Sequence, residues 1–226
     1  MNIIIATIHG WNIRNYYKWK EPEGYKKHLI TDKENLKLGN VKKINPKYIF
    51  SPHWSWKIPE EIWKTYECVV FHMTDLPFGR GGTPLQNLIM RGIYKTKISA
   101  IRVTNQLDAG PIYLKKDFSI RDGSAQEIYE RASKIIFQMI EEIIKKKVDP
   151  VPQREKVTVF KRLTPMQSEI PLNLQPRQLY DFIRMLDAGS YPPAYLKFDD
   201  YRLEFKNAKL DNKQVFADVL IKKEEK

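Results

Sequence analysis

Residues 68–82 read CVVFHMTDLPFGRGG, a continuous apolar run followed directly by polar and glycine-rich positions. The apolar part, Cys68 to Phe71, is typical of a strand that is buried on both faces of a parallel sheet. Thr83 and Pro84 then supply an N-cap and a first-turn proline for a helix. The stretch therefore predicts a strand, a glycine-rich turn and a helix, with His72 placed where the strand ends.

Such a strand end is where open α/β sheets bind their ligands. Further apolar runs predict strands at Ile3–Ile8, His28–Ile30, Tyr48–Phe50, Ile98–Val103 and Ile112–Leu114. Helical patterns alternate with these runs, so we predict an α/β fold with an open, mostly parallel, Rossmann-like sheet. The first strand is not followed by Gly-x-Gly-x-x-Gly, which argues against a dinucleotide cofactor in the usual position.

A long helix and a change of pattern suggest how the chain is divided. Ser124 and Glu127 have the spacing of a capping box, and the apolar stripe that follows indicates a helix packed on the sheet. Asp149-Pro150-Val151-Pro152 ends that helix, and from Thr158 onward short alternating runs surround one helix at Pro176–Leu186. We predict a larger α/β domain that carries the strand-end site at residues 1–150, a linker at 151–165 and a small, β-rich carboxyl-terminal domain at 166–226.

Composition narrows the classes of function. The formal net charge of +12 favours an anionic partner such as a nucleotide, pyrophosphate, polyglutamylated folate or RNA, although a lysine-rich surface that only aids solubility explains it almost equally well. Cys68 is the one cysteine, so we expect neither a disulfide framework nor a thiolate metal site. No apolar stretch approaches the roughly 18 residues of a membrane span, and Ile3 to Ile5 begin a strand at once, so we expect a cytoplasmic protein without a signal peptide.

The site sequence resembles the folate-dependent formyltransferases, the group that includes methionyl-tRNA formyltransferase and the sugar-nucleotide N-formyltransferases. Their pattern is Asn-x-His, a Leu-Pro turn, Arg-Gly, Pro-x-Gln and later Leu-Asp-x-Gly. The matching residues here are His72, Thr74, Leu76-Pro77, Arg80-Gly81, Pro84-x-Gln86 and Leu107-Asp108-x-Gly110. The family's asparagine falls on Val70, which has no polar group. Ile183–Asp187 and Tyr191–Tyr195 also resemble the start of the family's carboxyl-terminal domain.

The resemblance implies a formyltransferase fold, with attack by a primary amine on the formyl carbon of 10-formyltetrahydrofolate as co-substrate. Histidine moves protons near neutral pH, so we predict His72 as the catalytic base. A carboxylate beside the imidazole fixes its tautomer and stabilises its charged form, which is the role predicted for Asp108. Because Val70 has no donor, we predict that His53 donates to the developing oxyanion. The alternative for His53 is a structural histidine bonded to a neighbouring carbonyl.

The same resemblance suggests binding residues. For the folate these are Trp54, Trp56 and Ile58, which occupy the place of the family's pterin-gripping loop, and the turn residues Leu76, Pro77, Arg80 and Gly81. For the other substrate we predict Asn12 and Arg14, which lie in a loop at residues 9–14 after the first strand, together with Thr74, Gln86 and Asn105. A surface turn with an ordinary arginine is the alternative for Asn12 and Arg14. The four histidines lack metal-ligand spacing, so no metal is expected.

We predict an N-formyltransferase that acts on an amino sugar carried on a nucleotide, because the carboxyl-terminal region is too short for the usual tRNA-acting architecture. The alternatives are a methionyl-tRNA formyltransferase, a catalytically inactive folate or nucleotide-sugar binding module, and a hydrolase of formyl-folate. An RNA-binding protein ranks below these, since there is neither an RNP-type aromatic motif nor a concentrated basic helix. The predicted partner is a nucleotide sugar, with no nucleic acid and no membrane. The sequence leaves the oligomeric state open, a homo-oligomer included.

Overall fold

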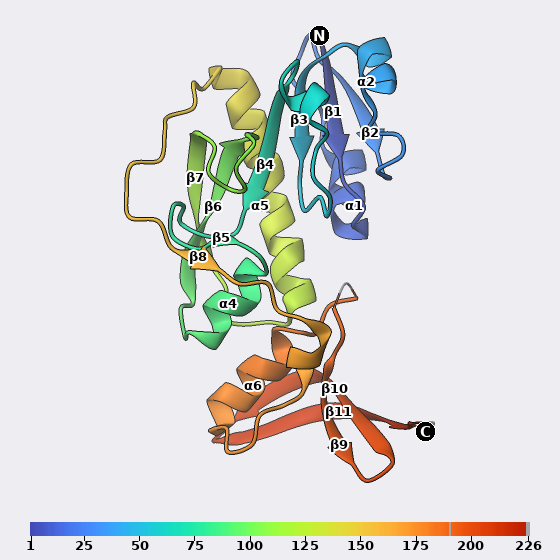
Figure 1. Ribbon diagram of the computed structural model, residues 1–226, viewed down its shortest axis with the longest axis vertical. Helices are drawn as coiled ribbons and strands as arrows, with labels where there is room; N and C mark the ends of the chain where they lie inside the picture. Colours follow the sequence, from blue (N-terminus) through green and yellow to red (C-terminus); the bar gives the residue numbers. More distant parts are fainter. Residues whose placement is uncertain (190, 225–226) are drawn as a thin grey trace. The chain divides into compact units, whose positions relative to one another are not determined.

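The computed structural model describes residues 1–189 and 191–224 of the chain (Figure 1). Its contacts form two compact units, each built from several segments. The first unit comprises Met1–Gly81, Thr96–Phe118 and Glu130–Val159, and the second comprises Gly82–Lys95, Ser119–Tyr129 and Phe160–Lys226. The units therefore interleave along the chain, and the consecutive domains with a linker at 151–165 stay a prediction.

The first unit is organised around a six-stranded sheet with the strand order β2-β1-β3-β4-β6-β7. The strands are β1 (Asn2–Ala6), β2 (Lys26–Ile30), β3 (Pro46–Ser51), β4 (Glu67–His72), β6 (Lys95–Arg102) and β7 (Ile112–Ser119). β1 pairs in parallel with β2 and β3, and β3 pairs in parallel with β4, whereas β4 and β6 are antiparallel. The predicted α/β fold with a mostly parallel sheet is confirmed.

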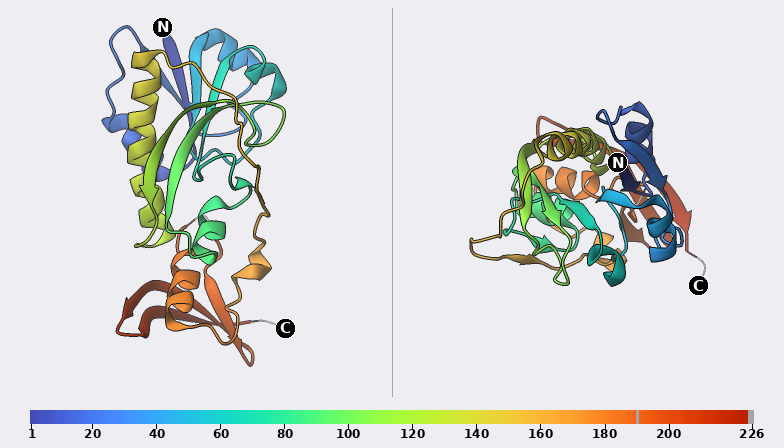
Figure 2. Two further views of the ribbon diagram at one scale, coloured as in Figure 1. Left: turned by 90° about the vertical axis from the view of Figure 1, so that its left-hand side faces the viewer. Right: turned by 90° about the horizontal axis from the view of Figure 1, so that it is seen from above.

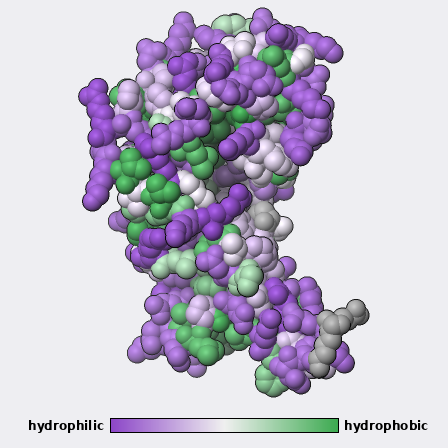
Figure 3. All heavy atoms as spheres, in the orientation of Figure 1, coloured by the Kyte–Doolittle hydropathy of each residue, from purple (hydrophilic) through white to green (hydrophobic). Residues whose placement is uncertain are grey.

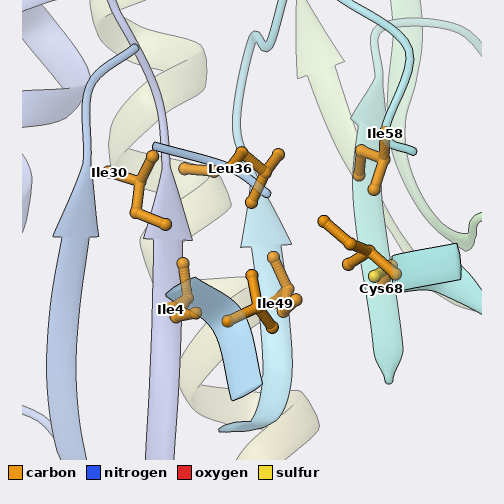
Figure 4. Close-up of a cluster of buried hydrophobic side chains, with 9 residues drawn as sticks. Ile4, Ile30, Leu36, Ile49, Ile58 and Cys68 are labelled. Carbon is orange, nitrogen blue, oxygen red and sulfur yellow. The ribbon is translucent and has the colours of Figure 1, made fainter. Parts of the chain in front are cut away.

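The apolar runs form these strands because both faces of the sheet are covered. Ile3, Ile4 and Ile5 are all fully buried, although successive side chains of a strand point to opposite faces. One face carries the core cluster shown in Figure 4, which we define as Ile4, Ala6, Ile30, Leu36, Val41, Ile49, Ile58, Ile62 and Cys68. Burial in this cluster raises the pKa of the Cys68 thiol to about 12, so the thiol is inert at neutral pH.

Four helices accompany this sheet: α1 (Gly10–Lys18), α2 (Leu38–Ile44), α3 (Glu60–Trp63) and α5 (Ala125–Lys146). The loop predicted at residues 9–14 is wrong, because α1 begins at Gly10 and buries Trp11, Asn12 and Tyr16. Tertiary burial of two aromatic rings outweighs a weak local helical pattern. α1 and α5 lie side by side, with Asn15 Nδ2 donating to Ser133 Oγ at 2.7 Å (Figure 2).

The expected start of α5 is confirmed by its hydrogen bonds. The Ser124 backbone N–H donates to Glu127 Oε2 at 2.8 Å, and the Glu127 N–H donates to Ser124 Oγ at 3.3 Å. This reciprocal pair satisfies two donors that a helix start leaves unpaired. The apolar stripe of the helix is core, since Ile128, Ala132 and Ile136 are fully buried.

The second unit contains an antiparallel sheet with the order β11-β10-β9, as predicted for a β-rich carboxyl-terminal region. Its elements are α4 (Pro84–Met90), a 3₁₀ turn (Pro165–Ser168), α6 (Pro176–Arg184), β9 (Ala194–Phe198), β10 (Tyr201–Asp211) and β11 (Gln214–Lys223). Arg184, which is 1% exposed, donates to Asp181 Oδ1 at 2.6 Å and to the carbonyls of Ile120 and Gly123. This buried ion pair fixes α6 against segment 119–129.

A short two-stranded sheet joins β5 (Arg80–Gly81) to β8 (Val159–Phe160). The Arg80 N–H donates to the Thr158 carbonyl at 2.9 Å, so the glycine-rich turn is tied to residues far along the chain. In the part of the chain that the structure describes, no helix is both long and apolar enough to cross a bilayer. Hydrophilic side chains dominate the face drawn in Figure 3, in keeping with 39 Lys+Arg residues.

Candidate active site

His72 is the last residue of β4 and its ring is held at both nitrogens. Nε2 lies 2.7 Å from the Gly79 carbonyl oxygen, and Nδ1 lies 3.5 Å from Asp108 Oδ2. Gly79 has φ 74°, a backbone conformation that favours glycine and turns its carbonyl toward the ring. Because a carbonyl only accepts, Nε2 carries a hydrogen and Nδ1 is the nitrogen that faces the carboxylate. The structure thus brings together the two residues expected to act as a pair.

The Asp108 carboxylate is positioned by the glycine-rich turn and by a residue that the sequence did not single out. Its Oδ2 accepts from the Gly81 N–H at 2.9 Å. Gln153 Nε2 donates to the carbonyls of Asp108 and Gly110 at 2.9 and 2.8 Å, and Gln153 Oε1 accepts from Arg80 Nη2 at 2.7 Å. One glutamine, placed by sequence reasoning in a linker, therefore locks the Asp108 loop to the Arg80 turn.

The turn between His72 and Arg80 is packed rather than open. Thr74 and Leu76 are fully buried. Ser99 of β6 donates to the Thr74 carbonyl at 2.7 Å and accepts from the Leu76 N–H at 3.3 Å, another role without a sequence signal. The Leu76–Pro77 peptide bond is cis. The buried side chains of Thr74 and Leu76 argue against the expected ligand contacts through them.

His53 lies just beyond the end of β3 in a polar cluster with the start of α1. Trp11 Nε1 donates to His53 Nδ1 at 3.3 Å, and Asn12 Nδ2 lies 3.2 Å from the same nitrogen. Burial, reinforced by the nearby His9, lowers the pKa of His53 from 6.5 to about 3. The ring is therefore neutral, and because Nδ1 accepts, its hydrogen is on Nε2.

The two residues of α1 expected to bind substrate have other partners. Asn12 is fully buried, and its Nδ2 also donates to Thr7 Oγ1 at 2.9 Å and to the Pro52 carbonyl at 3.1 Å. It thereby joins the ends of β1 and β3. Arg14 pairs with Glu130 at 2.9 Å, and the two side chains are 60% and 40% exposed. These contacts favour a structural role for Asn12 and a surface ion pair for Arg14.

The loop after β3 divides its side chains between core and surface. Ile58 is 7% exposed and belongs to the core cluster (Figure 4). Trp54 packs against that cluster with a buried Nε1 that has no hydrogen-bond partner among the described residues. Trp56, whose ring meets that of Trp54 edge to face at 5.1 Å, is 41% exposed. A ligand here would meet the tryptophans and the backbone, not the Ile58 side chain.

The remaining expected site residues lie in different environments. Gln86 is fully buried in the second unit and donates to the Met185 carbonyl at 2.9 Å, which is a packing role and argues against substrate contact. Asn105 is exposed in the loop that carries Asp108. Across residues 1–189 and 191–224, no group of three or more His, Cys, Asp or Glu side chains is arranged to hold a metal ion.

Comparisons with known proteins address the family and the substrate. The family model described as "Methionyl-tRNA formyltransferase, C-terminal domain" matches residues 165–222. The solved structure of methionyl-tRNA formyltransferase from Clostridium thermocellum is 53% identical, with a TM-score of 0.96 over 99% of both chains. Methionyl-tRNA formyltransferase of Sulfurihydrogenibium sp. is 28% identical over 181 residues, 76% of this chain and 58% of that protein, so this chain spans little more than half of that relative.

A third comparison shows the fold alone. HypX from Aquifex aeolicus, solved in complex with tetrahydrofolic acid, is 17% identical with a TM-score of 0.73, over 91% of this chain and 37% of that one.

These findings correct two expectations. The amino sugar on a nucleotide is the wrong substrate, and the exclusion of nucleic acid as a partner is wrong with it. The short carboxyl-terminal region was the reason for expecting a sugar substrate. The Clostridium thermocellum protein, named as a methionyl-tRNA formyltransferase, aligns over 99% of both chains and is therefore equally short. A short carboxyl-terminal region is thus no mark of a sugar substrate.

Proposed function

The chain belongs to the methionyl-tRNA formyltransferase family, and from this premise we propose that it transfers the formyl group of 10-formyltetrahydrofolate to the amino group of methionyl-tRNA. The observation that carries the proposal is the 53% identity over 99% of both chains to a protein of that name. The resemblance of residues 72–110 to folate-dependent formyltransferases, seen in the sequence, is thereby confirmed. The relevant partners become a folate co-substrate and an aminoacylated RNA.

The loop after β3 suits a flat heterocycle such as the pterin of a folate. Trp56 offers an aromatic face that is 41% exposed, and Trp54 Nε1 is a buried donor without a partner in the described chain. Buried donors are normally satisfied, so an unpaired one is a natural contact for a ligand acceptor. When bound, 10-formyltetrahydrofolate supplies the activated formyl group.

His72 is the group that accepts the proton of the attacking amine in this proposal. Its Nε2–H is committed to the Gly79 carbonyl, so Nδ1 takes the proton. The ring then carries a charge, which lies 3.5 Å from Asp108 Oδ2. The His72 and Asp108 side chains are only 8% and 11% exposed, and charges attract more strongly where water is excluded. Asp108 thus favours the protonated ring that the reaction produces.

Arg80 and Gln153 act through Asp108. Arg80 holds Gln153, which in turn holds the backbone on both sides of the carboxylate, at Asp108 and Gly110. These two residues position the catalytic pair, because neither bonds His72 directly in the contacts described. Arg80 was predicted to bind folate, and its bonds to Gln153 support the positioning role.

The proposal is tested by incubating the purified chain with methionyl-tRNA and 10-formyltetrahydrofolate. We expect formylmethionine, detected by mass spectrometry after the ester is cleaved from the tRNA. His72→Ala should abolish it, and Asp108→Asn should lower kcat by roughly two to four orders of magnitude, as in catalytic triads. Gln106→Ala, a matched change at an exposed position of the same loop, should leave the rate unchanged.

Three results would contradict the proposal. The first is a folded protein that binds both substrates and forms no formylmethionine. The second is a faster reaction with a nucleotide-linked amino sugar than with methionyl-tRNA. The third is wild-type turnover by His72→Ala, which would remove the base from its role.

A further inference from the structure

Register in the sheet places one buried hydroxyl on the same face as His72. In the parallel pair β3 and β4, Ile49 lies opposite Cys68 and Ser51 lies opposite Val70. Ile49 and Cys68 both turn into the core cluster (Figure 4). Side chains alternate along a strand, so residues two positions apart face the same side. Ser51, two residues after Ile49, and Val70, two residues after Cys68, therefore face the side of the core cluster. His72, two residues after Val70, faces that side too.

The Ser51 hydroxyl is enclosed and unused. The residue is 1% exposed, and its Oγ has no hydrogen-bond partner among the described residues. Ser99, which lies opposite His72 in β6, shows the contrast, since its hydroxyl bonds both Thr74 and Leu76. Buried hydroxyls in folded proteins are normally bonded, so the unpaired one beside the reacting pair calls for an acceptor from outside the chain.

Strand geometry gives the scale of the arrangement. Neighbouring strands lie about 4.8 Å apart and a strand rises about 3.3 Å per residue, which puts the α-carbons of Ser51 and His72 roughly 8 Å apart. A carbonyl whose attacking amine is in contact with His72 falls within this distance. Val70, between the two residues, is apolar and packs against the core cluster, so it offers no donor. Ser51, next to Val70 on this face, has a hydroxyl hydrogen that bonds no acceptor among the described residues.

From these observations, and resting on the proposed function, we infer that the Ser51 hydroxyl donates a hydrogen bond to the formyl oxygen during transfer. The amine nitrogen bonds to the formyl carbon, and the carbonyl electron pair moves to the oxygen. Ser51 keeps its proton and stabilises that charge. His72 Nδ1 takes the proton of the amine. The electron pair on the oxygen then re-forms the carbonyl, the old carbon–nitrogen bond breaks with its electron pair going to the folate nitrogen, and His72 gives that nitrogen a proton.

His53, the donor predicted from the sequence, has a weaker claim to this role. Its backbone adopts a left-handed φ of 50°, so the alternation of the strand no longer sets where its ring points. The ring lies against Trp11 and Asn12 of α1. These contacts hold the neutral ring by its Nδ1. The geometry thus favours Ser51 as the donor, and the two assignments give different mutant results.

The test measures kcat, KM for both substrates and Tm in Ser51→Ala. Loss of one oxyanion donor typically lowers kcat by roughly a hundredfold or more, with little change in KM. We expect that result together with an unchanged or raised Tm, because the variant no longer buries an unpaired hydroxyl. Ser119→Ala, a change at the exposed last residue of β7, is the matched control and should behave as wild type. Val70→Asn added to Ser51→Ala should recover at least tenfold in kcat, since an amide there faces the same side.

Several outcomes would overturn the inference. Wild-type kcat in Ser51→Ala removes the donor role. If Ser51→Ala lowers both kcat and Tm, and Val70→Asn does not restore kcat, then Ser51 has a packing role. Loss of turnover in His53→Ala while Ser51→Ala stays active gives the role to His53. If the wild-type protein is inactive, the proposed function itself is overturned. That failure is detected with the wild-type protein alone, before any variant is tested.

Discussion

The ring of His53, whose Nε2 is buried, couples one protonation step to the stability of the fold. Burial lowers its pKa from 6.5 to about 3, whereas in the unfolded chain the ring returns to the ordinary value. Unfolding therefore takes up a proton at any pH between these two values. Stability contributed by the neutral ring is fully present above about pH 6.5, and it is lost as the pH falls toward 3.

We expect proton uptake by His53 on unfolding to lower the free energy of unfolding by about 2 kcal/mol as the pH falls from 7 to 5. Urea denaturation at a series of pH values measures the slope. His53→Gln should flatten it over that interval, and His28→Gln, at a less enclosed ring, should change it less. An identical slope in His53→Gln and wild type would show that the ring is not held neutral. His9, whose pKa is also lowered by burial, acts in the same direction.

Single residues also show where sequence reasoning stops. His72 and Asp108 were predicted as a pair because the end of a strand and the family pattern both point to them. In the structure, His72 Nδ1 lies 3.5 Å from Asp108 Oδ2. Gln153 was missed because its bond to the Asp108 backbone spans 45 residues and leaves no local pattern. Ser51 was missed because its importance comes from register with Val70 in the neighbouring strand.

At the scale of elements, the loop between β6 and β7 has a fixed path because Gly110 packs against β6. A Cβ at Gly110 would lie 1.8 Å from the Arg102 carbonyl oxygen, which is backbone and cannot swing aside. Gly110→Ala should therefore lower the free energy of unfolding by about 1–3 kcal/mol. It should also displace Asp108. Turnover should therefore fall even at a temperature where the variant is fully folded, and where loss of folded protein cannot explain the fall.

Gly39 in α2 provides the opposite case. No heavy atom lies within 4 Å of a Cβ built there, so Gly39→Ala should raise stability by about 0.5–1 kcal/mol. Thermal unfolding of the two variants gives the comparison. If Gly110→Ala and Gly39→Ala changed Tm by the same amount, the packing argument for Gly110 would be contradicted.

Elements differ in how far their sequence predicts them. β1, β4 and α5 follow from apolar runs and a capping box, because burial and helix-end hydrogen bonds leave local patterns. The sequence predicted a loop where α1 forms, since its nine residues include as many polar as apolar side chains. Burial of Trp11 and Tyr16 in the fold is what stabilises the helix. The pairing of β5 with β8 was equally out of reach, because it joins Arg80 to Thr158.

At the scale of the whole molecule, fold class could be predicted and substrate could not. The alternation of strands and helices predicts a mostly parallel sheet, because few architectures bury such a pattern. The choice between an amino sugar and a charged tRNA depended on the size of the carboxyl-terminal region, which does not separate the two. The second unit also draws on residues 82–95 and 119–129, which no composition shift along the chain marks.

The net charge of +12 leads to a prediction about salt. A protein that neutralises phosphates releases condensed counterions, so affinity for tRNA falls with a power of the salt concentration. Three phosphate contacts would lower it roughly twenty- to fortyfold between 50 and 200 mM salt. We therefore expect KM for methionyl-tRNA to rise by at least that factor over this range, while KM for a monoglutamyl 10-formyltetrahydrofolate changes only about twofold. Steady-state kinetics with each substrate varied in turn gives both numbers, and kcat at saturation serves as the control for salt effects on the catalytic step. A tRNA KM that is flat with salt would mean that the excess of Lys and Arg serves solubility, and that recognition rests on uncharged contacts.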